Sequence, residues 1–389
     1  MKTSRREFLG TIAVTPLALM STTACQAASE PAQETGVSNE KMVMLVGDGP
    51  RITPAQYIDL FSHIHGENEI RQDNYGRGGT VAELEETFAR RLGKEAALFF
   101  PTGTLANHMA IVGQTRGRPR VILQEQSHVN CDAEKGLHEV SGLITEIIPS
   151  QDGTFDPEVI ERLLIPKGAR KTDVGVISVE NPVRRAHGRV LDQKALLKLA
   201  NMAGKHGIRL HLDAARMDLA CVFSGTTPAE IAAPFDTVYV SLYKYLHAPG
   251  GAILAGPAKL LEQLREKRHM NGGTLYQCWM FAAVALHALD GFSQRLTQAR
   301  DKSRICFTEL ASEGLALEPI PNGSNIFRLH LPKDSDPARF STLLQEKGII
   351  LNRSSRSFHG FHIWINETFN FRPTDLLTAH LRDALNGSK

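Results

Sequence analysis

The sequence lacks the cysteine patterns that mark a zinc site or a disulfide framework. Its five cysteines are Cys25, Cys131, Cys221, Cys278 and Cys306. No two of them form a Cys-x-x-Cys pair, and with the histidines they do not make the repeated spacing of a zinc site. We therefore expect no metal site and no disulfide framework, and we expect the cysteines of the folded part to be buried thiols.

The sequence also lacks an excess of charge of either sign. Lys and Arg number 44, Asp and Glu number 42, and the formal net charge is +2. Proteins that bind nucleic acid or acidic membranes ordinarily carry a marked basic excess, so neither partner is expected. With 389 residues, of which 42% are hydrophobic, the chain is long enough for a full core and for two domains.

The apolar run nearest the N-terminus is too short to span a membrane. Residues 8–20 are interrupted by Gly10 and Pro16, whereas a spanning helix needs about 20 consecutive apolar residues. We therefore expect no transmembrane span in the mature protein.

The N-terminus instead has the features of an export signal. The segment "SRREFLG" contains adjacent Arg5 and Arg6 followed by an apolar pair, which is typical of the twin-arginine pattern. We predict that residues 1–27 are a twin-arginine signal peptide and that the mature protein is periplasmic. Lipid anchoring through Cys25 in "TTAC" is the alternative.

Short apolar or β-branched runs alternate with amphipathic helical patterns in the central part of the chain. The expected strands are 95–100, 120–124, 174–180, 207–212, 236–242 and 251–256. Helical patterns at 80–93 and 192–207 lie between them, and the second ends on Gly207, which suits the left-handed position after a helix. This alternation predicts an α/β fold in which helices flank a mostly parallel sheet.

The pattern changes near residue 295. A long helical stretch, short strands and a closing helix predict a smaller α+β C-terminal domain. Residues 26–40 have small, polar side chains without periodicity, which is typical of a flexible linker. The predicted organisation is a signal at 1–27, a linker and N-terminal arm at 28–46, a large domain at 47–294 and a small domain at 295–389.

A lysine in an unusual position gives the first indication of function. The segment "YVSLYKYLHAPGGAIL" places Lys244 after an expected strand and before a Pro-Gly-Gly turn. A lysine in such apolar, glycine-flanked surroundings is costly unless it is paired or chemically used. Ligands of open parallel sheets bind beyond the carboxyl ends of the strands, so Lys244 is a candidate for an amine that takes part in chemistry.

Other polar residues also follow expected strands. "FFPTGTLAN" carries Thr102, Gly103 and Thr104 at the start of a helical pattern, where hydroxyls and free N–H groups can bind an anion. Thr104 as a helix cap without a ligand is the alternative. His128 follows the second strand, where an ordinary polar histidine is the alternative to a catalytic one.

The segment "HLDAAR" adds a carboxylate. It places Asp213 at a strand end and Arg216 three residues later, and a local ion pair between them is the alternative to a shared site. Pyridoxal phosphate (PLP) needs an amine for a Schiff base, a carboxylate beside its pyridine nitrogen, an anion site and an aromatic ring to stack on it. Lys244, Asp213, the 102–107 turn and His128 supply these in turn.

At this point the sequence resembles a known family. The segments "DNYGRGGTVAELEETFARRLGKEAALFFPTGTLANHMAI", "ISVENP", "GIRLHLDAARM" and "VYVSLYKYLHAPGGAILAG" are similar to the low-specificity threonine aldolase and β-eliminating lyase group of fold-type I PLP enzymes. The resemblance runs from about Asp48 to about Gln277. It implies that Lys244 carries the cofactor, that Asp213 pairs with the pyridinium nitrogen and that His128 stacks on the ring.

The resemblance implies further roles. Gly103 and Thr104, in the turn that begins at Thr102, would bind the phosphate. Arg216 would contact the substrate carboxylate or the phenolic oxygen of the cofactor.

The resemblance also implies an assembly. Active sites of this group form at a dimer interface, so we expect a homodimer or homotetramer with shared sites. Tyr75 and Arg77 would reach into the neighbouring subunit's site to bind substrate.

The chain departs from the family pattern at positions that would touch the substrate. It has Tyr243 for a serine, Pro182 and Val183 for Thr-His, Tyr276 for an arginine, Gly47 for a serine and His362 for an arginine. Arg185 and His187, with Arg184, are candidate replacement contacts for the substrate. The cofactor residues are therefore kept, while substrate recognition is altered.

These expectations lead to a predicted reaction. We predict a PLP-dependent carbon–carbon lyase that cleaves a β-hydroxy-α-amino acid to glycine and an aldehyde. Lys244 and Asp213 would serve the cofactor, and His128 would be the base, with His187 behind it. β-Elimination, transamination or racemisation on the same cofactor, and a non-catalytic exported binding protein, are the alternatives.

Overall fold

The computed structural model describes residues 42–150, 152–164 and 173–389. The predicted signal peptide, Cys25 and the predicted linker at 26–40 lie outside these residues. Within them, no helix combines the length and the apolar composition needed to cross a membrane.

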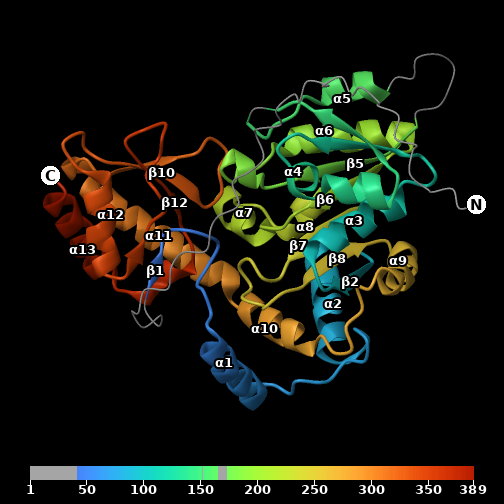
Figure 1. Ribbon diagram of the computed structural model, residues 1–389, viewed down its shortest axis with the longest axis horizontal. Coiled ribbons are helices and arrows are strands. Elements are labelled where there is room, and N and C mark those ends of the chain that lie inside the picture. Colours follow the sequence, from blue (N-terminus) through green and yellow to red (C-terminus); the bar gives the residue numbers. More distant parts are fainter. Residues whose placement is uncertain (1–41, 151, 165–172) are drawn as a thin grey trace, which may run out of the picture. The chain divides into compact units, whose positions relative to one another are not determined.

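A seven-stranded sheet is the centre of the larger part of the fold (Figure 1). Its strand order is β2-β8-β7-β6-β5-β3-β4. The neighbours from β7 to β4 are parallel, and β8 runs antiparallel to both β7 and β2. The strands are β2 (Ala96–Phe100), β3 (Arg120–Gln124), β4 (Ile144–Ile148), β5 (Val174–Glu180), β6 (Arg209–Asp213), β7 (Thr237–Ser241) and β8 (Ala252–Gly256).

This sheet confirms the predicted α/β fold and the six predicted strand segments. Sequence reasoning missed β4, because this edge strand is only partly buried and its "ITEII" sequence carries no clean apolar run. Helix α6 (Gln193–His206) ends at Gly207, whose φ of 61° is the predicted left-handed conformation.

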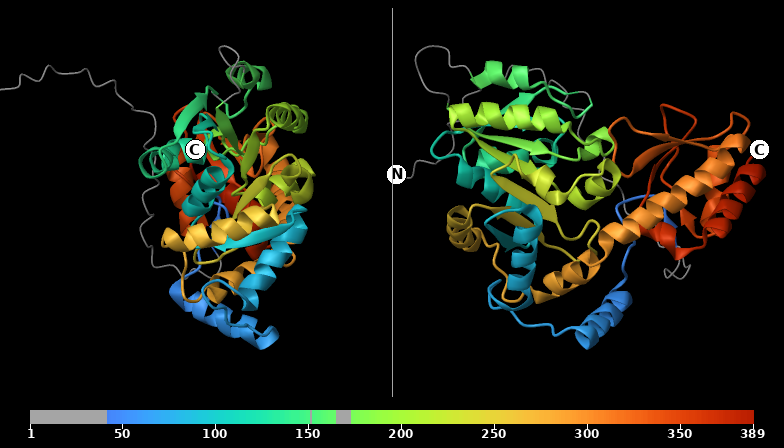
Figure 2. Two further views of the ribbon diagram at one scale, coloured as in Figure 1. Left: turned by 90° about the vertical axis from the view of Figure 1, so that its right-hand side faces the viewer. Right: turned by 180° about the vertical axis from the view of Figure 1, so that it is seen from behind.

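Helices cover both faces of the sheet, as Figure 2 shows. Side chains alternate along β2: Ala97 and Phe99 pack into the core below α2, whereas Leu98 and Phe100 pack into the core below α3. This alternation explains why both faces of β2 are apolar. One face carries α3 (Gly103–Gln114), α4 (His128–Lys135) and α9 (Ala258–Met270). The other core includes α2 (Gly79–Leu92), α5 (Pro157–Leu164), α6, α7 (Met217–Ser224), α8 (Pro228–Ala232) and α10 (Trp279–Leu289), and α1 (Pro54–Glu67) packs on α10.

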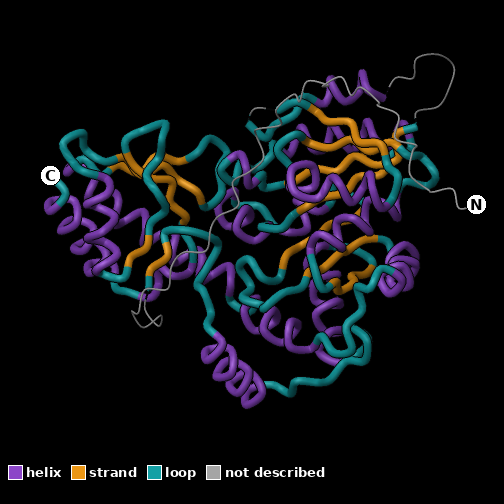
Figure 3. Tube along the Cα trace, in the orientation of Figure 1, coloured by secondary structure: helices purple, strands orange, loops and turns teal. Residues whose placement is uncertain are grey.

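A smaller antiparallel sheet follows in the C-terminal part, and Figure 3 shows its strands in orange apart from the larger sheet. Its order is β12-β10-β9. In a separate two-stranded sheet, β1 pairs in parallel with β11, which brings residues 43–44 beside residues 349–350. The elements are β1 (Val43–Met44), β9 (Ala316–Pro319), β10 (Ile326–His330), β11 (Ile349–Ile350), β12 (Gly360–Trp364), α11 (Phe292–Leu310), α12 (Pro337–Glu346) and α13 (Thr374–Gly387).

The predicted domain boundary at residue 295 stays a prediction. Helix α11 contributes Phe292 and Leu296 to the core of the larger sheet and Cys306 and Phe307 to the core of the C-terminal sheet. One continuous helix thus belongs to both cores.

The cysteines follow the expectation for buried thiols with one exception. Cys221, Cys278 and Cys306 are buried and form no disulfide. Cys131 is only half-buried, and its Sγ lies 3.3 Å from the Glu125 carbonyl oxygen, to which it donates a hydrogen bond.

Candidate active site

The carboxyl ends of β5, β6 and β7 bring charged side chains together. Glu180 and Asp213 end β5 and β6 and pair directly in the register of the sheet. Lys244 follows in the turn after β7. The charges of Arg216, Asp213, Asp48 and Glu180 all act on the Lys244 amine. The edge predicted from the sequence therefore holds a single charged site.

Lys244 is largely buried, and this environment changes its acidity. Burial lowers the pKa of its amine to about 8, and the Arg216 charge lowers it too, whereas the carboxylates around it act in the opposite direction. Among the described residues, Nζ has no hydrogen-bond or ion-pair partner, and the Tyr243 ring centroid lies 5.7 Å away. A largely buried, partly neutral amine of this kind is a nucleophile toward a carbonyl carbon.

The turn that carries Lys244 is anchored on both sides. Tyr245 is fully buried, and its hydroxyl donates to Asp218 Oδ2 at 2.8 Å. On the other side, the Gly251 N–H donates to the Pro101 carbonyl at 3.1 Å. The amine is thereby held at a fixed place next to the turn that precedes α3.

We expect Lys244 to react as an amine with an unusually low pKa. Reductive methylation of the apoprotein, followed by mass spectrometry of the Lys244 peptide, should give a labelling rate that is half-maximal at about pH 8. The neutral amine is the reactive form, so the rate follows its population. A midpoint near the ordinary lysine value of about 10.4 would contradict this account of the site.

Asp213 lies at the end of β6 with only 1% of its surface exposed. Asn107 Nδ2 donates to Oδ2 at 2.8 Å, and the Ala215 N–H donates to Oδ1 at 3.1 Å. An ionised carboxylate can accept about four hydrogen bonds. Asp213 therefore keeps the capacity to accept further donors from the site.

Arg216 is held by an acid that sequence reasoning missed. Its Nε lies 2.8 Å and 2.9 Å from the two carboxylate oxygens of Asp48, which precedes it by 168 positions. Burial opposes the charge, but Asp48, Glu180 and Asp213 together raise the Arg216 pKa. The ion pair of Arg216 is thus with Asp48, and the alternative of a simple local pair with Asp213 is wrong. Arg216 also lies just before α7, with φ −127° and ψ 35°, and not in a helical turn.

Glu180 is a second missed carboxylate. Its Oε2 accepts the His128 backbone N–H at 2.5 Å, and its Oε1 accepts the Arg184 N–H at 2.9 Å. Burial, and then the Asp213 charge, raise its pKa. Glu180 therefore fixes the start of α4 and the Arg184–Ala186 turn at the end of β5. Glu180 ends one of the expected strands, so the sequence alone could have indicated that it belongs to the site.

His128 is the first residue of α4 and part of a polar cluster around Asp132. His128 Nδ1 lies 2.8 Å from Asp132 Oδ2, one helical turn further on, and the imidazole side chain is 30% exposed. Arg185 Nη2 donates to Asp132 Oδ1 at 2.8 Å, and Arg184 Nη2 lies 3.4 Å from Oδ2. The structure thus brings the predicted residues His128 and Arg185 together through Asp132, which sequence reasoning did not single out.

His187 does not join this cluster. Its ring stacks on His362 of β12, with the centroids 4.3 Å apart and the planes 6° apart. Burial lowers the pKa of His187. Burial and the neighbouring charge of His187 together lower the pKa of His362 to about 4. The position that aligns with a family arginine is therefore a neutral ring, and it provides no positive charge for a carboxylate.

The predicted phosphate turn forms the N-terminus of α3. Thr102, and not Thr104, caps the helix: its Oγ1 accepts the Leu105 N–H at 3.2 Å. Within the described residues, the N–H groups of Gly103 and Thr104 have no acceptor. A Cβ at Gly103 would lie 2.2 Å from Tyr239 Oη, so this close packing requires glycine. Free N–H groups at a helix N-terminus attract an anion.

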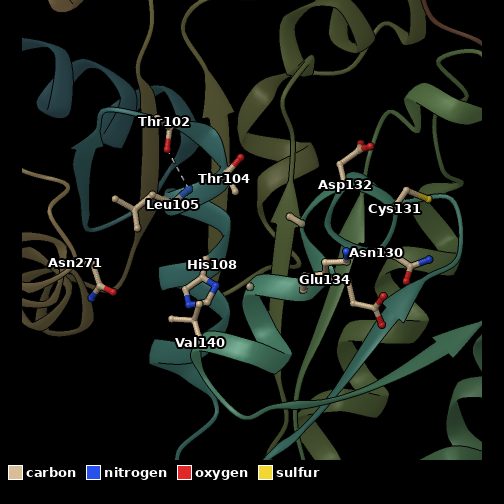
Figure 4. A pocket seen from close by; sticks show the side chains of 13 residues that line it. Thr102, Thr104, Leu105, His108, Asn130, Cys131, Asp132, Glu134, Val140 and Asn271 are labelled. Atoms are coloured by element: carbon tan, nitrogen blue, oxygen red, sulfur yellow. Dashed lines mark hydrogen bonds between the residues drawn. The ribbon is translucent and has the colours of Figure 1, made fainter. Parts of the chain in front are cut away.

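An open cavity of about 690 Å³ adjoins this turn between α3 and α4 (Figure 4). Thr102 and Thr104 lie on one side, and Asp132 and Cys131 lie on the other. Lys244 and Asp213 do not line it. The cavity therefore leads to the anion turn and to the Asp132 cluster, and not to the strand ends themselves.

Tyr75 and Arg77 lie elsewhere on the chain. Both side chains are exposed, and the Tyr75 ring packs edge-on against Tyr276 with centroids 5.4 Å apart. Buried Arg268 supports this loop through the Tyr75 carbonyl. No contact between the described residues brings Tyr75 or Arg77 to Lys244, so their role in a neighbouring subunit stays a prediction.

The residues present fit an aldehyde cofactor with a basic ring nitrogen and a phosphate. Lys244 offers an unpartnered amine, Asp213 offers free acceptor capacity, and Gly103 and Thr104 offer unpaired N–H groups. By contrast, no group of three or more potential metal ligands occurs among the described residues. The amine of Lys244 can react with a carbonyl carbon, and the carboxylate of Asp213 and the N–H groups of Gly103 and Thr104 can stabilise charge.

Comparison with known proteins gives consistent matches. Residues 63–328 match the family described as β-eliminating lyase. A low-specificity L-threonine aldolase of Arabidopsis thaliana is 29% identical over 81% of this chain and 90% of its own. The crystal structure of a putative L-allo-threonine aldolase from Listeria monocytogenes has a TM-score of 0.72 and 23% identity, over 90% of this chain and 97% of that chain. A variant of the serine palmitoyltransferase from S. paucimobilis with a bound PLP–myriocin aldimine has a TM-score of 0.63 and 16% identity, over 90% of this chain and 88% of that chain. These two structures show the fold.

The predicted periplasmic location is wrong. The relatives that this chain matches are low-specificity L-threonine aldolases of Arabidopsis thaliana, Saccharomyces cerevisiae and Escherichia coli, and none of these names indicates an exported protein. The twin-arginine motif lies outside the described residues and is not confirmed. An arginine pair before a short apolar run is a small pattern that composition alone can produce.

Proposed function

This chain belongs to the β-eliminating lyase family, and we propose from this premise that it is a PLP-dependent lyase of the threonine aldolase type. It cleaves a β-hydroxy-α-amino acid into glycine and an aldehyde. The observation that carries the proposal is the unpartnered Lys244 amine with a pKa of about 8 beside buried Asp213. When bound, PLP accepts the electron pair released as the Cα–Cβ bond of the substrate breaks.

The residues around this centre have separate tasks. Lys244 would hold the aldehyde of the cofactor through its amine. Asp213 would accept a hydrogen bond from the ring nitrogen, and Gly103 and Thr104 would bind the phosphate. Arg216, held by Asp48, presents its remaining N–H groups to the phenolic oxygen or to the substrate carboxylate.

His128 is the base that removes the proton of the β-hydroxyl group. Its Nδ1 proton is donated to Asp132, which leaves Nε2 as the basic atom and stabilises the positive charge of the ring after proton transfer. His187 is a less suitable base, because it is stacked on His362 away from this cluster.

Arg185 is proposed to bind the substrate carboxylate. It and Arg184 share the single carboxylate of Asp132, so this cluster keeps an excess positive charge. Arg185 would thus supply the positive charge that the family pattern places at the position of His362, where this chain has a neutral ring. His187 is left as a contact for the distal part of the substrate.

The active unit is proposed to be a homodimer or a homotetramer of this chain. Exposed Tyr75 and Arg77 then contact the substrate in the partner's site. Light scattering of the purified protein gives the mass directly, and a monomer with full activity would contradict the shared site.

Product identification tests the proposed reaction. Purified protein with PLP is incubated with a panel of β-hydroxy-α-amino acids, and the products are identified by chromatography. Glycine and an aldehyde in equal amounts support the proposal. Ammonia and a keto acid would replace it with β-elimination, the reaction that the family description names.

Asp132→Asn should lower kcat on the order of 10²-fold. A neutral amide no longer stabilises the charge that the His128 ring gains on proton transfer. Arg185→Gln is the matched control: it removes another contact of Asp132, and steady-state kinetics should show a raised KM with a smaller effect on kcat. A native kcat in a folded Asp132→Asn protein would exclude His128 as a base held by Asp132.

A further inference from the structure

A line of buried polar side chains lies beneath Asp213. It runs from α3 to β7, to β6 and back to α3. Its members, with their exposed fractions, are Gln114 (3%), Thr237 (0%), His211 (0%) and Asn107 (1%). Each is hydrogen-bonded to the next, and the last bonds to Asp213. Buried polar groups are costly unless they are satisfied, so their arrangement calls for an explanation.

The direction of every hydrogen bond in this line can be assigned. Gln114 Nε2 donates to the Ala110 carbonyl at 3.0 Å and to Thr237 Oγ1 at 2.7 Å. A carbonyl oxygen only accepts, so the amide orientation is fixed. The Thr237 oxygen accepts this bond, and its own hydroxyl hydrogen is free to be donated to His211 Nδ1, 2.8 Å away.

The remaining two bonds follow from this assignment. With Nδ1 as acceptor, His211 carries its hydrogen on Nε2 and donates to Asn107 Oδ1 at 2.9 Å. Asn107 Nδ2 in turn donates to Asp213 Oδ2 at 2.8 Å. Burial lowers the pKa of His211 to about 4, so the ring is neutral and carries a single N–H.

The opposite tautomer does not fit. A hydrogen on Nδ1 would leave Nε2 as an acceptor facing Asn107 Oδ1, and two acceptors would then lie 2.9 Å apart. Turning the Asn107 amide over would remove that conflict, but its oxygen could then face Asp213 Oδ2 only if that oxygen carried a proton. An ionised Asp213 therefore fits one direction of the line, from Gln114 to Asp213, in which the line ends on an oxygen that accepts.

We propose that Asn107 and His211 are positioning residues that keep Asp213 ionised and oriented toward the ring nitrogen of the cofactor. This inference rests on the proposed function. The line supplies a donor to Oδ2, and the Ala215 N–H supplies one to Oδ1, and hydrogen bonds donated to both oxygens favour the ionised carboxylate. Asp213 then holds the ring nitrogen protonated because its own carboxylate remains the acceptor.

The first test uses the unaltered protein. In ¹⁵N-histidine-labelled apoprotein, the ring signals of His211, assigned by their loss in His211→Gln, should report a neutral ring with hydrogen on Nε2. Hydrogen on Nδ1, or a charged ring at pH 7, would overturn the proposed direction. This result does not depend on cofactor binding or on the folding of a variant with an apolar substitution.

The second test measures PLP itself. Asn107→Leu removes the donor to Asp213, and we expect the Kd of PLP to rise about 10- to 100-fold, the usual worth of a hydrogen bond to a charged group. The visible absorption of the bound cofactor should also change its dependence on pH, and kcat should fall more than KM rises. Thr237→Val, three hydrogen bonds from Asp213, should change the Kd by less than about 3-fold. Native spectrum and affinity in a folded Asn107→Leu protein would overturn the proposal.

The two failures can be told apart. Unaltered protein that does not bind PLP would contradict the proposed function as a whole. Unaltered protein that binds PLP, together with an Asn107→Leu variant that binds it equally well, would contradict only the positioning role.

Discussion

Lys244→Ala should abolish the lyase activity, with a fall in kcat/KM of at least about 10⁴-fold. Loss of a nucleophile that acts as one unit with its partners removes most of the rate enhancement. The fold should persist, because Nζ makes no hydrogen bond or ion pair with the described residues and Tyr245 still anchors the turn to Asp218. Steady-state kinetics and circular dichroism check the two parts of this result.

The matched control is Lys259→Ala on the exposed surface of α9. This variant should keep native kinetics. A Lys244→Ala protein that retains more than a tenth of native activity would remove Lys244 from the chemistry, and the site would then need another explanation.

Asp213→Asn should weaken PLP binding at least as much as Asn107→Leu does and, at saturating PLP, should lower kcat by about 10³-fold. A neutral amide cannot hold the ring nitrogen protonated, and preorganised charge stabilisation of this kind contributes on the order of 10² to 10³ in rate. The fold should tolerate the change, because the new amide can still accept from Asn107 Nδ2 through its oxygen. Single-turnover kinetics and the absorption spectrum of the bound cofactor measure the effect.

The control for this variant is Asp334→Asn, a carboxylate on the exposed surface. Its kinetics should equal those of the native protein. Near-native kcat in Asp213→Asn would contradict the role given to the carboxylate and to the polar line beneath it.

Much of the fold could be predicted from local pattern. Strands β5 and β7 are buried along their whole length and rich in β-branched residues, and Gly207 has no side chain to oppose the left-handed conformation. By contrast, β1 and β11 are two residues each and pair over some 300 positions. Such short strands carry no period of their own, so only tertiary structure defines them.

The residues of the candidate site that lie at the carboxyl ends of strands could be predicted from the sequence. Lys244 follows β7 and Asp213 ends β6, and topology alone brings these strand ends together. Asp48 could not be found in this way, because its contact with Arg216 depends on how a distant segment passes the site. Asp132 lies one helical turn from His128, so their contact could have been predicted if the sequence had shown that α4 begins at His128.

Borohydride reduction followed by peptide mapping tests the central claim most directly. The purified protein with PLP is reduced with borohydride and digested, and the modified peptide is sequenced by mass spectrometry. The account predicts one reduced pyridoxyl adduct per chain, located on Lys244, and none on the Lys244→Ala protein. An adduct on another lysine, or no adduct at all, would contradict the account.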